Sequence, residues 1–60
     1  MAAKFEIFSD KSGEYRFHLK AGNGEIIAAS QGYESKASAK NGIESIKKNA
    51  AAADVVDLTE

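Results

Sequence analysis

The side chain best suited to chemistry in this 60-residue sequence is its single imidazole, His18. Arg16 and Lys20 stand two positions away on either side, so a strand would place all three on one face. Because cationic neighbours disfavour a charged imidazole, we expect a neutral histidine at the surface. Catalysis also requires a nucleophile with a base, paired carboxylates or a metal held in a cleft, and so short a chain offers little cleft. We therefore predict no enzyme activity, no catalytic residue, no metal ligand and no cofactor.

Two glycine-containing segments are candidates for a phosphate-binding site. Gly22-Asn23-Gly24 lacks the third glycine of a dinucleotide fingerprint and the lysine of a P-loop, so it is predicted to be a hairpin turn. The segment 32–40 opens a helix with a glycine, a capping serine and lysines, and it is similar to the helix start with which double-stranded-RNA-binding domains contact phosphates. The preceding helix of that domain is absent, and Lys36 stands alone where a lysine pair is usual. A solvated lysine face is the favoured interpretation. RNA binding is the alternative, with contacts at Arg16, His18, Lys20, Lys36 and Lys40.

These side chains must be positioned by strands and a helix, and the first two strands follow from alternating apolar residues. Residues 4–9 place Phe5 and Ile7 on one face, which is the period of a strand. The run 15–21 repeats the pattern, and its inward-facing residues are Tyr15, Phe17, Leu19 and Ala21. Aromatic residues at this spacing favour a strand over a helix.

The loop between these strands sets their register. A three-residue loop over 11–13, with Gly13 in the left-handed conformation, pairs Asp10 with Glu14. This register places Ile7 opposite Phe17. A four-residue loop would mix the two faces, so the hydrophobic pattern selects the shorter loop.

A second hairpin is predicted at Asn23-Gly24, because these residues can take the positive φ values of a type I′ turn. This turn pairs Gly22 with Glu25 and begins a third strand over residues 25–31. The strand order is then 1-2-3. The third strand adds to the core face the side chains of Ile26 and Ala28.

A helix is predicted from Lys36 to about Asn49, with Ser35 as its N-cap. Its apolar stripe consists of Ala39, Ile43, Ile46 and Ala50. Its outer face carries i,i+4 ion pairs among Lys40, Glu44 and Lys48. Gly42 weakens a helix interior by about 1 kcal/mol. It indicates either a close contact with the sheet or a tolerated weakness.

Apolar residues remain that this unit does not cover, and they form a predicted interface. One group lies on the second sheet face and the other in the acidic tail, residues 51–60. The candidate interface residues are Phe8, Ile27, Ala29, Val55, Val56 and Leu58. The tail has strand-like composition without a turn to bring it back, so it either pairs as a fourth strand with a partner chain or is frayed.

Size and composition favour self-association. A 60-residue chain buries only about 60% of the surface that its unfolded form exposes. The usual supports for so small a core are disulfides, a metal or a partner chain, and this sequence has no cysteine and one histidine. We therefore predict one domain over 1–60 with its core at about 4–50, which forms a homodimer and associates with an unknown protein partner. No segment has the length of a membrane span or a signal peptide, so we expect a cytoplasmic protein.

The sequence as a whole resembles the YegP-like family of small bacterial proteins of unknown function. The resemblance is carried by Lys20-Ala-Gly-Asn-Gly-Glu-Ile-Ile-Ala28 and Gly32-Tyr-Glu-Ser-Lys36, together with the flanking strands and the helix. It implies an α+β fold, βββα with a possible short fourth strand in the tail, and no catalytic residues. Some relatives carry two copies of the unit in one chain. This implies that two units pack together, so it also predicts a homodimer for a single-copy chain.

Overall fold

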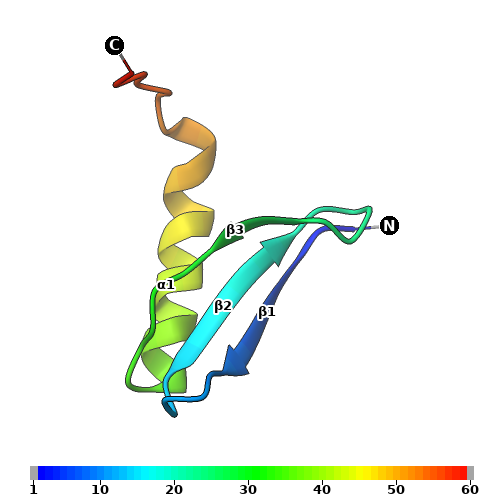
Figure 1. Cartoon of the computed structure of the whole chain (residues 1–60). Coiled ribbons are helices and arrows are strands. Elements are labelled where there is room, and N and C mark those ends of the chain that lie inside the picture. Colours follow the sequence, from blue (N-terminus) through cyan, green and yellow to red (C-terminus); the bar gives the residue numbers. More distant parts are fainter. Residues whose placement is uncertain (1, 60) are drawn as a thin grey trace.

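A three-stranded antiparallel sheet and one helix make up the fold, as the computed structural model shows for residues 2–59 (Figure 1). The strands are β1 (Lys4–Ser9), β2 (Tyr15–Lys20) and β3 (Ile26–Ala29), in the spatial order β1-β2-β3. Helix α1 (Lys36–Asn49) follows and ends in a short 3-10 turn, Ala50–Ala52. The predicted α+β class, strand order and helix bounds are confirmed.

The first hairpin has the predicted loop and register. Gly13 takes a φ of 83°, and the Asp10 amide donates to the Glu14 carbonyl at 2.8 Å. Ile7 therefore lies opposite Phe17. The Asp10 side chain also fixes the loop, because its Oδ1 accepts the backbone N–H groups of Ser12 and Glu14 at 2.9 and 3.0 Å.

The second hairpin differs from the prediction. Gly24 alone has a positive φ, 88°, so the turn is not type I′, and Ala21 rather than Gly22 pairs with Glu25. The reason is local: Asn23 stays at negative φ, and its Oδ1 accepts the Glu25 amide at 3.0 Å. The resulting one-residue shift is absorbed by a bulge opposite Lys20, after which Leu19 lies opposite Ala28 as predicted. The strand is also shorter than the predicted 25–31, although Ser30 still donates its amide to Phe17.

Helix α1 begins where predicted because Ser35 caps it. The Ser35 hydroxyl accepts the Ser38 amide at 3.1 Å, which satisfies one of the free N–H groups of the first turn. Gly42 marks a close contact: a Cβ at this position would lie 2.7 Å from the Tyr33 Oη and 3.3 Å from Phe17 Cε2. The close-contact interpretation of Gly42 is thereby confirmed. On the outer face Glu44 pairs with Lys47 at 3.7 Å instead of with Lys40 or Lys48.

The buried core is small, and it lies between α1 and the first two strands. Phe17, Ala39 and Ile43 are buried, with partly buried Phe5, Ile7, Tyr15 and Tyr33 packed around them. The prediction that Ile26 and Ala28 join this core is wrong, because α1 packs on β1 and β2 and leaves all of β3 exposed. Ile46 and Ala50 are likewise exposed. The last turns of α1 extend past the sheet, and the tail projects further from it (Figure 1).

The tail forms no strand in the described part of the chain. Residues 53–59 have neither helix nor strand, and Val55, Val56 and Leu58 are 98%, 72% and 87% exposed. With 14 residues, α1 is too short to span a bilayer, and residues 2–59 contain no other helix that could do so.

Candidate functional site

The sheet face opposite α1 carries the predicted mixture of apolar and charged side chains. Phe8 and Ile27 are 42% and 59% exposed, and Ala29 is exposed as well. The Phe8 ring lies beside the His18 ring, with 5.1 Å between their centroids. An apolar surface of this kind suits a protein contact better than it suits solvent.

The Glu6 carboxylate contacts three basic side chains on this face. Glu6 lies opposite His18 in the β1–β2 register, and its Oε1 is 2.7 Å from His18 Nε2 and 3.2 Å from Lys20 Nζ. Lys4 Nζ approaches the other carboxylate oxygen at 3.4 Å. The hydrogen bonds from His18 and then Lys20 lower the pKa of Glu6 from 4.5 to about 2. We call Glu6, His18, Lys20 and Lys4 the Glu6 cluster.

The Glu6 cluster corrects the sequence-based view of His18. That view counted only the cations Arg16 and Lys20, whereas the closest charged neighbour in the structure is the Glu6 carboxylate. The first-hairpin register already places these two residues opposite each other, so the signal was present in the sequence. With its pKa lowered, Glu6 is ionised at neutral pH and holds no proton to donate as a general acid.

The positive charge of Arg16 is also paired with a carboxylate. Its Nε donates to Asp10 Oδ2 at 2.6 Å, which lowers the pKa of Asp10 and raises that of Arg16. The same aspartate holds the first hairpin loop, so its geometry is fixed from two sides.

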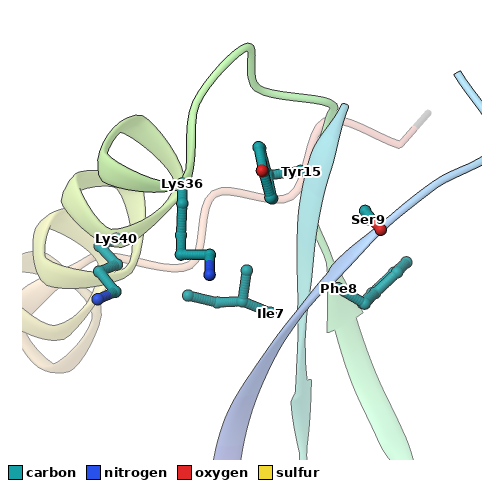
Figure 2. Close-up of a pocket in the computed structure, with 6 residues that line it drawn as sticks. All are labelled: Ile7, Phe8, Ser9, Tyr15, Lys36 and Lys40. Atoms are coloured by element: carbon teal, nitrogen blue, oxygen red, sulfur yellow. The ribbon is translucent and has the colours of Figure 1, made fainter. Parts of the chain in front are cut away.

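The five residues predicted to contact RNA therefore do not form one basic surface. Arg16, His18 and Lys20 each have a carboxylate partner on the sheet face. Lys36 and Lys40 project from α1 on the other side of the sheet (Figure 2). Phosphate binding depends on free positive charge that displaces counterions, and among these five residues only Lys36 and Lys40 lack a carboxylate partner within the described chain. The structure does not support the RNA-binding alternative.

Lys36 and Lys40 instead line a groove between α1 and β1 (Figure 2). The groove has a volume of about 420 Å³ and is lined by Ile7, Phe8, Ser9, Tyr15, Lys36 and Lys40. We call it the lysine groove. The Lys36 Nζ lies 6.0 Å from the centroid of the Tyr15 ring, and the side chain reaches from α1 toward Tyr15 and Ile7. Sequence reasoning missed this groove because it treated both lysines as a solvated helix face.

The Glu6 cluster and the lysine groove offer different chemical groups. Within residues 2–59 no three side chains among His, Asp and Glu come close enough together to hold a metal ion. The groove contains cationic, hydroxyl and apolar side chains without a carboxylate or an imidazole. These are the groups of a binding site for an anionic and partly apolar partner.

Residues 10–57 match the family model described as a domain of unknown function, DUF1508. Among curated relatives, UPF0339 protein Atu0232 of Agrobacterium fabrum is 64% identical over 56 residues, which is 93% of this chain and 90% of that protein. A UPF0339 protein of Treponema denticola is 60% identical and is covered over its whole length, against 97% of this chain. UPF0339 protein YegP of Yersinia pestis is 58% identical over 75% of this chain, but only 40% of that protein is covered.

Solved structures agree with the fold. A solution structure of a Haloferax volcanii protein matches with a TM-score of 0.86 at 49% identity, covering 93% of this chain and 95% of that one. The solution structure of ATU0232 from Agrobacterium tumefaciens matches with a TM-score of 0.80 at 62% identity, covering 93% and 90%.

Proposed function

This chain belongs to the DUF1508 family of uncharacterised proteins, which includes YegP, and we propose that it works as a non-enzymatic homodimeric interaction module in the cytoplasm. Its role would be to associate with a further protein through surfaces that the dimer presents. The proposal rests on the exposed apolar side chains.

The isolated unit leaves too many large apolar side chains uncovered for its small core. Ile26, Ile27 and Ile46 are 54%, 59% and 39% exposed, whereas only three of residues 2–59 are buried. Full burial of one isoleucine side chain contributes about 1.5–3 kcal/mol, so covering these residues would add substantially to a core worth about 3–5 kcal/mol. A second copy offers the same exposed residues and can cover them reciprocally across a two-fold axis.

The length of some relatives supports the same arrangement. This chain spans 40% of YegP from Yersinia pestis, which leaves room there for a second unit of similar size. Two units joined in one chain are the covalent equivalent of a homodimer.

Light scattering over a range of concentrations tests the proposal. We expect a mass of two chains in the upper micromolar range, and a shift toward one chain for Ile27→Glu. Ile27 is more than half exposed, so the fold of the monomer should tolerate the change. Gln31→Glu is the matched control, because it adds the same charge at an exposed position outside the apolar surface.

A chain that stays monomeric at millimolar concentration would contradict the proposal. If Ile27→Glu and Gln31→Glu weaken association equally, the sheet face is not part of the interface.

A further inference from the structure

The two lysines of the lysine groove have no anionic partner in the described chain. Lys36 and Lys40 form no ion pair within residues 2–59, whereas Lys4, Lys20 and Lys47 each do. Lys36 and Lys40 stand four positions apart on α1, so their side chains leave the helix on the same side, with Cβ atoms about 5–6 Å apart. Two like charges at this spacing repel each other, and an anion bound between them would remove that repulsion.

The start of α1 adds to the positive potential of the groove. Lys36 is the first residue of this helix, and the first turn contains no acidic residue. The positive end of the helix dipole therefore lies beside the two ammonium groups. An anionic group that carries two negative charges matches this end of the groove better than a group that carries one.

Strand β1 supplies backbone donors on the opposite wall of the groove. Two opposite residues of an antiparallel pair either bond to each other or both point their backbone groups outward. Tyr15 bonds through its backbone to Tyr33, so Ser9, which lies opposite Tyr15, points its N–H to the open edge of the sheet. Ile7, opposite Phe17, continues this alternation. Backbone N–H groups of this kind are good donors to an oxyanion.

The groove also has an apolar part. The side chains of Ile7 and Tyr15 are only partly buried there, and Lys36 Nζ lies 6.0 Å from the centroid of the Tyr15 ring (Figure 2). An inorganic anion would leave both side chains in contact with water. An aromatic group attached to the anion would cover them and pack against the Tyr15 ring. The volume of about 420 Å³ lies in the range of small-molecule sites, about 300–1,000 Å³.

The charge pattern favours a small ligand over a nucleic acid strand. Two lysines serve one phosphate group, whereas a strand requires a series of phosphate contacts. The other candidate cations, Arg16, His18 and Lys20, have carboxylate partners. A phosphate monoester carries about 1.5–2 negative charges at neutral pH, and a carboxylate carries only one. The monoester is therefore the better match to two lysines.

We propose that the lysine groove binds a small organic phosphate monoester with an aromatic body. The phosphate group lies between the ammonium groups of Lys36 and Lys40, and the aromatic body covers Ile7 and Tyr15. The monoester is bound as a ligand, and no bond is formed or broken. This inference does not depend on the proposed homodimer, because all of the lining residues belong to one chain.

Nuclear magnetic resonance titration of the isotope-labelled full-length protein with phenyl phosphate tests the site. We expect the amide signals of the groove residues to shift, with a dissociation constant of about 1 mM or below, as is typical of so small a ligand. Inorganic phosphate and benzoate are the comparison ligands. Each should bind about tenfold more weakly, because the first lacks the ring and the second lacks the additional charge.

Lysine variants provide the second measurement. Lys36→Gln and Lys40→Gln should each weaken the binding of phenyl phosphate about tenfold, because each removes one charged donor. Lys48→Gln is the matched control, since Lys48 is exposed on the same helix and does not line the groove. It should leave the dissociation constant unchanged. The spectrum of each variant without ligand shows whether the variant is folded.

Several results would overturn the proposal. If benzoate binds as tightly as phenyl phosphate, the groove does not select a second charge, and if inorganic phosphate does so, the groove does not recognise an aromatic body. Shifts confined to the sheet face opposite α1, or unchanged affinity in Lys36→Gln and Lys40→Gln, would also contradict it.

Light scattering on the same samples separates this inference from the homodimer. If the two lysine variants change the measured mass and leave the affinity for phenyl phosphate unchanged, the groove is a contact between chains and the ligand site is refuted. A monomeric chain that binds phenyl phosphate as expected would contradict the homodimer alone.

Discussion

Replacing Gly42 with alanine should destabilise the protein, although the same change stabilises most helices. Alanine exceeds glycine in helix propensity by about 1 kcal/mol. At this position the new methyl group would lie 2.7 Å from the Tyr33 Oη, 3.2 Å from Tyr33 Cζ and 3.3 Å from Phe17 Cε2.

The ring of Tyr33 has little freedom to move away. It stacks on the ring of Phe17, with 6.0 Å between the centroids and 15° between the planes, and Phe17 is only 4% exposed. Overpacking a filled core costs about 1–3 kcal/mol, which exceeds the gain in propensity. We expect a net loss of up to about 2 kcal/mol in the free energy of unfolding.

Asn41→Ala is the matched control, since Asn41 is an exposed neighbour in the same turn of α1. It should gain about 0.5 kcal/mol from propensity alone. The two variants should then differ by several degrees in melting temperature, because about 1 kcal/mol shifts a domain of this size by about 4–8 °C. Both are melted by circular dichroism at one protein concentration, since association would add a concentration-dependent term. A Gly42→Ala protein as stable as Asn41→Ala would refute the close-packing argument.

Four further predictions follow from other contacts. Because Glu6 has a folded pKa of about 2, below its ordinary 4.5, the stabilisation from its ion pairs is complete above about pH 4.5 and is lost as the pH falls toward 2; Glu6→Gln should remove this part of the pH dependence of unfolding. Ser35→Ala should lower the free energy of unfolding by about 1 kcal/mol in urea titrations, because the Ser38 amide loses its acceptor. Gly24→Ala should cost about 1–2 kcal/mol through its φ of 88°, whereas Gly22→Ala, at a position without positive φ, should cost clearly less; equal losses would contradict the assigned turn. Titration with double-stranded RNA at low salt should show no binding, and an affinity that falls steeply with salt would contradict the assigned neutralisation of the sheet face.

The sequence was sufficient to predict the first hairpin because its two candidate registers have different consequences. Only the three-residue loop keeps Ile7 opposite Phe17, so the hydrophobic pattern decides between the loops. The helix could be predicted equally well, because Ser35 marks its start and the apolar stripe shows which side of it faces the sheet.

The second hairpin could not be predicted in the same way. Asn23 has a glycine on either side, so two turns of different register fit the same three residues. The third strand contains Ile26, Ile27, Ala28 and Ala29, which are apolar on both faces and therefore do not penalise a shift by one residue.

The lysine groove depends on tertiary placement. The spacing of Lys36 and Lys40 places them on one side of the helix, but it does not say which strand edge the helix start will adjoin. The Glu6 cluster, by contrast, could have been inferred, since the correct register already set Glu6 opposite His18.

The bulge in β3 makes the two edges of the sheet unequal. Two consecutive isoleucines, Ile26 and Ile27, lie opposite the single residue Lys20, and an extra residue of this kind bends a strand and increases its twist. A bent edge of four residues is a poor template for another strand, whereas β1 is regular over six residues. The irregular turn at Asn23 thus has an effect on solubility. It protects the exposed isoleucines of β3 from edge-to-edge aggregation, and it leaves β1 as the only regular edge of the described sheet.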